Sequence, residues 1–419
     1  MLKEISIKNF KSFNDEVLFS MEADVDRVSE FPDHLVKQGE NSILKVTSLY
    51  GPNGGGKTNL IEAIKFLRRV LNNEDNTLRM PTEYKCLYND SDIIEETVFF
   101  TDDEYEIGYN LQVKADVVHN DNFQLYQPTY YQYVTRFNIV HEEVIYKKHA
   151  NKEFVELFQR DIDGSLKSEL LKKIGIELPL ISKSKSMITK LYEEYANNEF
   201  SNNEGLIVLR RLYDEINSIN ELDMFPTQID VKYVEKYKKT LIKYMNDVDI
   251  KIDDIKIYNN NKPDYVYFVR KIKNGNKEIY KEIPLFQESK GTNKIFFIFL
   301  RILMSENASK IFVSDDMNSQ LHPKLYRAII EMFNSNKLHS QLIFNTHDMV
   351  NMNNTLFRRD EIWFAYRNEN YSTQLVPLSN IVNYKGDQVR KDAKYDKQYL
   401  EGKYGADPFI KNGLKWFDE

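Results

Sequence analysis

The chain has 419 residues, of which 42% are hydrophobic, so it is long enough for two or three structural units with sizeable cores. Its 57 Lys and Arg residues stand against 64 Asp and Glu residues, and the net charge of −7 argues against a protein that binds DNA over its whole surface. The single cysteine, Cys86, excludes an internal disulfide and is typical of a reducing compartment. The first residues lack the apolar core of a signal peptide, and no apolar run approaches the length of a membrane span. A soluble, cytoplasmic protein without membrane contact is therefore expected.

The N-terminal part predicts mainly strands. Alternating apolar and polar residues favour short strands over residues 1–22, and residues 43–50 form a β-rich apolar run that ends at a glycine-rich loop. After that loop, apolar residues recur at helical spacing. Residues 95–114 and 129–147 again favour strands, because β-branched and aromatic residues dominate them. We expect residues 1–150 to form the first lobe of the protein.

The middle of the chain is helical in period. Between residues 151 and 245 glycine is scarce, and Pro179 and Pro226 interrupt the pattern before any heptad repeat is sustained. This favours an inserted helical subdomain over a long coiled coil. Residues 232–244 carry five lysines and one glutamate, for which a solvated helix face is the ordinary explanation. Residues 246–419 return to strands and then alternate strand, helix and strand, as in a parallel α/β sheet.

The strongest motif is GPNGGGKT at residues 51–58, which fits the pattern G-x-x-x-x-G-K-T between a predicted strand and a predicted helix. Glycines allow successive backbone N–H groups to surround a polyphosphate, and the helix directs its positive end at the same anion. Lys57 is expected to reach the β- and γ-phosphates, and the Thr58 hydroxyl to bind Mg²⁺. The flanking elements argue against the alternative, a glycine-rich turn without a ligand. The residues expected to contact the nucleotide are Asn53, Gly54, Gly55, Gly56, Lys57, Thr58 and Asn59.

Acidic residues and a histidine follow two later strands. An apolar strand runs into Asp315 and Asp316, at the strand end where open α/β sheets bind ligands. Asp315 is expected to act on Mg²⁺ through its water shell, and Asp316 to orient or deprotonate the attacking water. The next apolar strand leads to His347, which is placed to contact a γ-phosphate or that water. The alternatives are two acids in an ordinary turn and a structural histidine.

A second candidate anion site opens the predicted helix of residues 293–304. Ser289, Gly291 and Thr292 provide a small, hydrogen-bonding helix start of the kind that binds anions. One chain rarely needs two phosphate sites for one nucleotide, so this site makes sense if it completes a site on another subunit. The alternative is a simple helix N-cap supplied by Ser289 or Thr292.

The motifs and their order resemble the ABC-type ATPase heads of the SMC, RecF and OLD group. The strings that carry the resemblance are NFKSF, GPNGGGKTNLIEAI, ESKGT, SDD, SQLHP and THD. In particular, the chain looks like bacterial stand-alone ATPases of abortive-infection and phage-defence operons, which share the SxGT signature, the LHP string and a C-terminal YLEGKYGADPF. The resemblance covers residues 1–115 and 245–405. It implies a P-loop NTPase of ABC-ATPase type, with a mixed or parallel sheet core, an antiparallel β subdomain and the inserted helical subdomain.

The resemblance also implies roles for residues outside the loop. Two chains would close around two ATP molecules, and Ser289, Gly291 and Thr292 would contact the γ-phosphate of the ATP held by the opposing protomer. Lys11 and Ser12 would lie near the base or phosphates of their own nucleotide.

One residue departs from the family pattern. Asp315 occupies the metal-binding position and His347 the switch position, but Asp316 stands where the family usually has a catalytic glutamate. An aspartate is one methylene shorter, and a misplacement of about 1 Å can cost around 100-fold in rate. Hydrolysis is therefore expected to be slow.

Four functions follow as alternatives. The first is an ATPase that dimerises around ATP and Mg²⁺, or forms a higher assembly of dimers, and gates an effector protein from a neighbouring gene, in anti-phage defence. The second is a RecF-like repair clamp on DNA, which would need a basic track that the overall charge does not support. The third is a scaffold that binds ATP with little turnover. The fourth, a transporter subunit, is weakened by the helical insertion and the missing LSGGQ-like signature.

Overall fold

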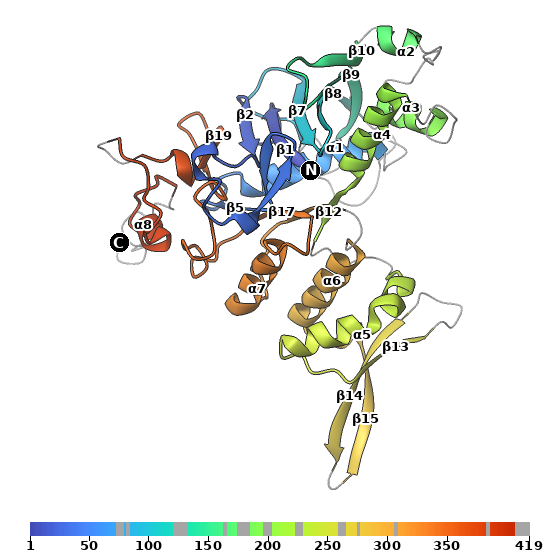
Figure 1. Ribbon diagram of the computed structural model, residues 1–419, viewed down its shortest axis with the longest axis vertical. Coiled ribbons are helices and arrows are strands. Elements are labelled where there is room, and N and C mark those ends of the chain that lie inside the picture. Colours follow the sequence, from blue (N-terminus) through green and yellow to red (C-terminus); the bar gives the residue numbers. More distant parts are fainter. Residues whose placement is uncertain are drawn as a thin grey trace.

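The computed structural model contains a parallel core sheet, a larger antiparallel sheet and a projecting three-stranded sheet, with helices between and around them (Figure 1). The predicted mixed α/β fold is confirmed. Among the helices that the structure describes, none is long and apolar enough to cross a membrane. The described residues are 1–72, 79–80, 84–119, 133–161, 166–173, 185–195, 203–222, 229–258, 265–274, 277–305, 309–382 and 386–406.

The core sheet has six strands in the order β12-β16-β17-β5-β18-β19. Neighbouring strands are parallel from β12 to β18, and β19 returns antiparallel to β18. The strand–helix–strand order in the second half of the chain therefore forms the parallel sheet that the sequence predicts. The bounds are β5 (Val46–Tyr50), β12 (Ile219–Glu221), β16 (Ile311–Ser314), β17 (Gln341–Asn345), β18 (Ile362–Arg367) and β19 (Thr373–Pro377).

The antiparallel sheet has eight strands, in the order β11-β10-β9-β8-β7-β1-β2 with β6 paired to β9. It confirms the strands predicted over residues 1–22, 95–114 and 129–147. Residues 129–132 lie outside the described part of the chain. The bounds are β1 (Leu2–Lys8), β2 (Val17–Ser20), β6 (Arg79–Met80), β7 (Ile93–Thr101), β8 (Tyr105–His119), β9 (Tyr133–Lys148), β10 (Val155–Arg160) and β11 (Leu166–Lys167). A separate hairpin joins β3 (Leu35–Gln38) to β4 (Asn41–Leu44).

Two hydrophobic cores cover the two faces of the core sheet. Along β5, Leu49 packs into the first core, whereas Val46 and Tyr50 pack into the second, as the alternation of a strand requires. The first core also contains α1 (Lys57–Asn72), α3 (Met187–Tyr195), α4 (Glu204–Asn217) and the antiparallel sheet, and short α2 (Glu169–Lys173) adds Leu171. The second core contains α5 (Val231–Asp247), α6 (Lys290–Met304), α7 (Pro323–Phe333) and α8 (Tyr395–Leu400).

The segment predicted as an inserted helical subdomain divides between these cores. The helical expectation is wrong for residues 155–160 and 166–167. There β10 pairs with β9 and β11 pairs with β10, which satisfies their backbone groups in the antiparallel sheet. The helices α3 and α4 pack in the first core, and α5 packs in the second. Between them, β12 joins the edge of the core sheet. The boundaries at residues 151 and 245 stay a prediction.

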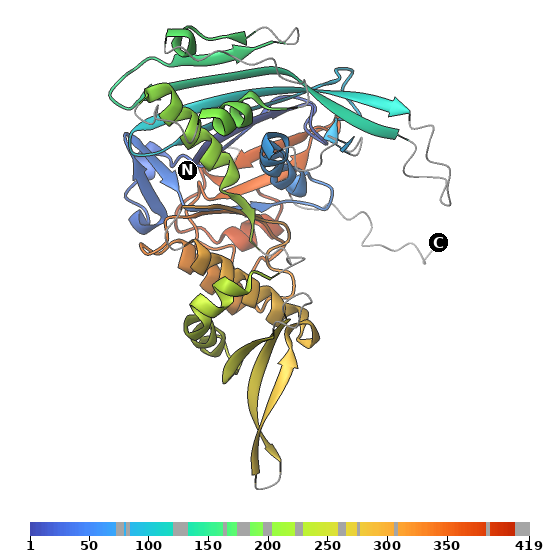
Figure 2. The same cartoon turned by 90° about the vertical axis from the view of Figure 1, so that its right-hand side faces the viewer.

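The three-stranded sheet projects from the end of the molecule that carries α5 and α6 (Figures 1 and 2). Its strands are β13 (Asp254–Tyr258), β14 (Tyr265–Asn274) and β15 (Lys277–Pro284). Phe268 of β14 packs edge-on against Phe296 of α6, which attaches the sheet to the second core. In α5, Val234, Leu241 and Met245 are buried while four of its five lysines are exposed, as a solvated helix face predicts.

Glu96 is a buried acid in the first core. It is 1% exposed, and among the described residues neither carboxylate oxygen has a hydrogen-bond partner. Its cross-strand neighbours are Ile7 and Leu111, and burial raises the pKa of Glu96 well above its ordinary value. The folded state therefore keeps a proton that the unfolded chain loses above its ordinary pKa. Consequently the free energy of unfolding falls as pH rises from the ordinary pKa of a glutamate toward the raised pKa of Glu96.

We expect Glu96→Leu to raise the free energy of unfolding by about 2 kcal/mol near pH 8, because leucine removes an unsatisfied polar group from the core. The gain should be smaller near pH 5, where the carboxyl is protonated more often in both states. Denaturant unfolding at the two pH values measures the difference, with Glu156→Gln, an exposed acid of β10, as the control. An equal or smaller gain near pH 8 would contradict the assignment.

Candidate functional site

The glycine-rich loop joins the end of β5 to the start of α1, as predicted. Gly51 and Gly56 have φ angles of 142° and 102°, which side-chain-bearing residues rarely adopt. A Cβ at Gly51 would meet the backbone oxygen of Ala365 in β18, and one at Gly56 would meet the Thr373 side chain in β19. The loop thus requires glycine because two neighbouring strands of the core sheet pack directly against it.

Lys57 begins α1 and lies over the loop. Its Nζ donates to the carbonyl oxygens of Gly51, at 2.8 Å, and Pro52, at 3.0 Å. Burial lowers the pKa of Lys57, while the carboxylates of Asp315 and Asp316 oppose that effect. Lys57 is therefore close enough to Asp315 and Asp316 to interact electrostatically with both carboxylates.

Thr58, Asp315 and Asn345 form one hydrogen-bonded group, although they come from three separate segments. The Thr58 hydroxyl donates to Asp315 Oδ1 at 2.8 Å. The Asn345 amide nitrogen donates to the same Asp315 oxygen and lies 3.5 Å from the Thr58 hydroxyl oxygen. The parallel order β16-β17-β5 causes this convergence, because it places the carboxyl ends of the three strands at one edge.

The Asp316 backbone is held from two sides. Its N–H donates to Asn345 Oδ1 at 2.5 Å, and its carbonyl oxygen accepts from Lys294 Nζ at 3.3 Å. The residue has a φ of 55°, a left-handed conformation that aspartate tolerates better than most residues. Its side chain is exposed beside the loop.

His347 follows β17 on the same edge. The Asn318 side-chain oxygen accepts from the His347 backbone N–H at 3.2 Å and from the Thr346 hydroxyl at 2.8 Å, which positions the strand end. Partial burial lowers the pKa of His347, Lys57 adds to this effect, and Asp316 and Asp315 act in the opposite direction. The structure thus brings His347 into electrostatic range of Lys57 and the acid pair.

The arrangement fits a magnesium–nucleotide complex. Thr58 and Asp315 are exposed, and their hydroxyl and carboxylate oxygens are in direct contact. Oxygen atoms are the ligands that Mg²⁺ prefers. The same ion usually keeps further positions for phosphate and water. Thr58 and Asp315 could therefore hold it beside the loop.

Lys11 and Ser12 lie in the turn between β1 and β2, next to α1. The Ser12 hydroxyl accepts from the Asn59 amide at 2.5 Å and lies 2.6 Å from the Thr373 hydroxyl oxygen. Lys11 Nζ lies 5.1 Å from the centre of the Tyr84 ring. Ser12 is thus bonded to the first turn of α1, and the contact of Lys11 and Ser12 with a nucleotide stays a prediction.

Ser289 is the N-cap of α6, because its side chain accepts from the Thr292 N–H at 3.1 Å. The capping explanation is therefore correct, and it leaves the anion-binding prediction open. Among the described residues, the side-chain hydrogen bonds of Ser289 and Thr292 connect the two residues to each other and not to the loop. A Cβ at Gly291 would meet the Gln320 backbone oxygen at 2.6 Å, so the start of α6 packs closely on the segment that follows the acid pair.

Sequence reasoning missed Asn345 and Thr373. Asn345 contacts both acids, and it stands two residues before His347, the residue of this segment that the sequence predicts to act. A polar residue at the end of an apolar strand, beside two acids on the neighbouring strand, was the available signal. Thr373 donates to the Gly55 oxygen at 3.1 Å from a distant hairpin, and no local pattern indicates it.

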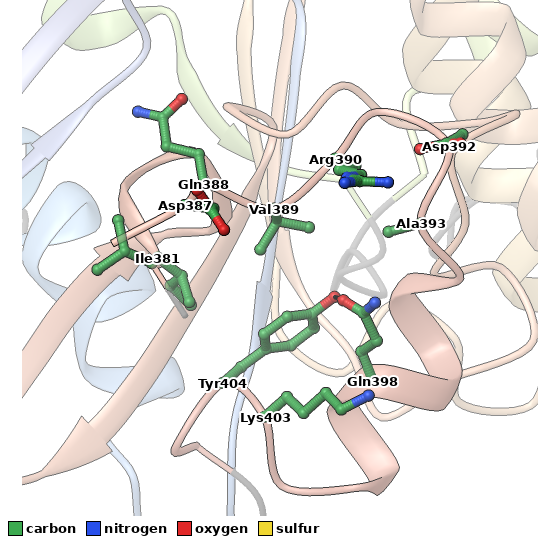
Figure 3. Close-up of a pocket in the computed structure, with 11 residues that line it drawn as sticks. Ile381, Asp387, Gln388, Val389, Arg390, Asp392, Ala393, Gln398, Lys403 and Tyr404 are labelled. Carbon is green, nitrogen blue, oxygen red and sulfur yellow. Dashed lines mark hydrogen bonds between the residues drawn. The ribbon is translucent and has the colours of Figure 1, made fainter. Parts of the chain in front are cut away.

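A cavity of about 740 Å³ lies away from this edge, among residues 381–404 (Figure 3). Its lining includes Lys403 and Tyr404 of the YLEGKYGADPF string, whose last three residues lie outside the described part. Tyr404 donates to Gln398 Oε1 at 2.9 Å, and its ring lies 5.2 Å from that of Phe364 in β18. The described part of the string thus packs against the core sheet. None of the predicted site residues lines this cavity.

The parallel sheet, the glycine-rich loop after β5 and the acid pair after β16, two strands away, define a P-loop NTPase of mixed α/β type. The chain belongs to the family described as "AAA domain, putative AbiEii toxin, Type IV TA system", which it matches over residues 46–353.

Three solved structures of SMC heads are similar to the chain. An SMC head domain from Thermotoga maritima is 16% identical, with a TM-score of 0.38, over 90% of this chain and 98% of that one. An SMC head bound to the C-terminal winged-helix domain of ScpA is 12% identical, with a TM-score of 0.38, over 90% and 97%. A Pyrococcus furiosus SMC head with an extended coiled coil, bound to the C-terminal domain of ScpA, is 14% identical, with a TM-score of 0.35, over 90% and 96%. No curated protein matches the chain.

Proposed function

We propose that the chain is a slow ATPase that binds ATP with Mg²⁺ at the P-loop and acts as an ATP-dependent switch. The observation that carries this proposal is the contact between Thr58 and Asp315, two residues 257 positions apart that meet beside Lys57. The P-loop motif and the acid pair are separate sequence signals, and their convergence is what a phosphate-bound magnesium ion needs.

The mechanism follows from the positions of these side chains. Lys57 exchanges its bonds to the Gly51 and Pro52 carbonyls for charge-assisted bonds to phosphate oxygens. Thr58 and Asp315 would hold Mg²⁺, whose charge would neutralise the phosphates. Asp316 accepts a hydrogen bond from the attacking water and orients it. The lowered pKa of His347 favours a neutral imidazole that bonds to the γ-phosphate or to that water.

We further propose that two chains share each site, as a homodimer or within a higher assembly of dimers. Ser289, Gly291 and Thr292 would meet the γ-phosphate bound by the opposing protomer. Support comes from the exposed helix start at Ser289, whose side chain, within the described part of the chain, bonds to Thr292 and not to the loop. Closure would then depend on the γ-phosphate, as in other nucleotide switches.

The biological output of the switch is the gating of an effector protein from a neighbouring gene, in cytoplasmic anti-phage defence. The description of the family, which names a putative toxin and a toxin–antitoxin system, supports this role. The net charge of −7 favours a protein partner over a DNA clamp. Copurification of the neighbouring gene product, with ATP and without it, tests this part; equal recovery in both conditions would argue against an ATP-dependent gate.

Phosphate release from ATP by the full chain, with Mg²⁺ and with a chelator, tests the ATPase assignment. We expect Mg²⁺-dependent release that Asp316→Glu raises by about 10-fold. The hydrogen bonds of the Asp316 backbone with Asn345 and Lys294 hold the backbone in place, so only a longer side chain brings the carboxylate closer to the attacking water. Asp316→Asn, which removes the carboxylate, should lower it. Unchanged turnover in Asp316→Glu would exclude the short side chain as the cause of slow hydrolysis. Absence of Mg²⁺-dependent release from the unmodified chain would contradict the assignment itself.

A further inference from the structure

Two exposed tyrosines stack on each other near the P-loop. The ring centres of Tyr88 and Tyr371 are 5.8 Å apart and their planes differ by 18°. Tyr88 is 57% exposed and Tyr371 is 61% exposed, and the adjoining Leu87 is 86% exposed. An exposed aromatic pair of this kind provides a flat apolar surface in contact with solvent, and such surfaces often mark binding sites.

The backbone of Tyr371 is in a conformation that its side chain disfavours. Its φ is 58°, in the left-handed region, where a bulky residue is a genuine outlier. Asn368 holds the turn there, since its carbonyl oxygen accepts from the Tyr371 N–H at 3.0 Å and its side-chain oxygen accepts from the Ser372 N–H at 3.0 Å. Asparagine or glycine would fit this backbone with less strain. Stability alone therefore does not explain a tyrosine at this position.

Short contacts connect the segment of Tyr371 to the P-loop and the segment of Tyr88 to the turn between β1 and β2. On one side, Thr373, two residues after Tyr371, donates to the Gly55 oxygen at 3.1 Å. On the other side, Asn89, the residue after Tyr88, donates to the Asn14 oxygen at 3.0 Å. Tyr371 therefore lies close to the P-loop and Tyr88 close to the turn between β1 and β2, because two residues of extended chain span at most about 7 Å.

The turn between β1 and β2 connects the pair to the first turn of α1. Ser12 accepts a hydrogen bond from Asn59 through its hydroxyl and another from the Thr373 N–H through its carbonyl oxygen, at 2.8 Å. The Ser372 hydroxyl accepts from the Asn14 N–H at 3.3 Å. The turn of residues 12–14 is thus hydrogen-bonded both to Asn59, the residue after Thr58, and to Ser372 and Thr373, the two residues that follow Tyr371.

We propose that Tyr88 and Tyr371 form a stacking platform for the base of the bound nucleotide, an inference that rests on the proposed nucleotide site. The phosphates would lie in the loop and the base would stack on an exposed face of the pair. Stacking depends on the area of the ring system and uses no base-edge hydrogen bonds, so the platform should prefer purines to pyrimidines and discriminate little between adenine and guanine.

The test measures the affinity of the full chain for ATP, GTP, UTP and inorganic tripolyphosphate, each with Mg²⁺. Tyr371→Asn removes the ring and relieves the backbone, so its stability should not fall, and Tyr88→Ala removes the partner ring. We expect both variants to bind ATP about 5- to 100-fold more weakly, which is the value of one base–aromatic stack. Binding of tripolyphosphate should stay within about twofold, because its contacts lie in the loop. Tyr280→Ala, which removes a tyrosine 65% exposed on β15, is the matched control.

Each result decides between distinct explanations. Unchanged ATP affinity in Tyr371→Asn would overturn the platform while leaving the nucleotide site intact, and so would an equal loss of ATP and tripolyphosphate binding. Unchanged ATP affinity with weaker self-association would assign the pair to a contact between copies of this chain instead. An unmodified chain that binds neither ATP nor tripolyphosphate would overturn the proposed function and the platform together.

Discussion

Lys57→Ala is expected to lower ATP turnover by about 100- to 1,000-fold, because the variant loses a preorganised cation at the site where negative charge develops. ATP binding should weaken as well, since a charge-assisted hydrogen bond contributes about 1.5–3 kcal/mol. Phosphate release and a binding titration measure the two effects. The substitution also leaves the Gly51 and Pro52 carbonyl oxygens without this donor, so the free energy of unfolding should be measured alongside.

Lys65→Ala is the matched control for this prediction. Lys65 lies on the same helix and forms ion pairs with Glu62 at 2.7 Å and Glu221 at 2.8 Å, away from the loop. We expect its loss to affect stability slightly and turnover little. Turnover in Lys57→Ala that equals that of the unmodified chain would show that the phosphate site has been assigned to the wrong residues.

Ser289→Arg is expected to abolish turnover while each chain still binds ATP, because the long cation would obstruct the surface that meets the partner's γ-phosphate. The same change removes the α6 N-cap, which costs about 1 kcal/mol. Asp230→Arg removes the N-cap of α5 in the same way and serves as the control for that loss. Ser289→Asp keeps a capping residue and should also block turnover, through repulsion of the phosphate. A loss of ATP binding by the isolated Ser289→Arg chain would argue against a shared site.

Mixing the two inactive variants gives a sharper test of the shared site. A dimer of one Lys57→Ala chain and one Ser289→Arg chain contains one intact site, formed by the loop of the second chain and the helix start of the first. In an equal, randomly exchanged mixture we expect about a quarter of the turnover of the unmodified chain. A mixture as inactive as its components would exclude a dimer with independent composite sites.

Local chemistry was predictable from the sequence, and long-range geometry was not. The P-loop and the acid pair are contiguous strings whose residue types serve phosphate and metal directly, so each was visible without the fold. The contact of Thr58 with Asp315 could be expected only because parallel strands align their carboxyl ends. Thr373 reaches the loop from the β18–β19 hairpin, a pairing that no periodicity encodes.

The wrong helical prediction for β10 has a related cause. Residues 155–160 follow the hairpin partner β9, and pairing with that strand determines their conformation. β-propensity depends on such partners more than helix propensity does, so the helical spacing of the residues that follow conceals the strand before them. The left-handed backbone of Asp316 was hidden for a similar reason, since it depends on bonds to Asn345 and Lys294 from other elements.

Lys294 has a consequence for how two nucleotides could influence each other. From within α6 it donates to the carbonyl oxygens of Asp316, at 3.3 Å, and Ser319, at 3.2 Å, and it is only 5% exposed. These two bonds resist a tilt of α6 unless the segment that carries Asp316 and Ser319 moves with it. In the proposed dimer, α6 would respond to the nucleotide of one site while Asp316 serves the other. Thermodynamic linkage then makes the effect reciprocal, so each ATP would change the affinity for its counterpart by the same factor, and binding would be cooperative.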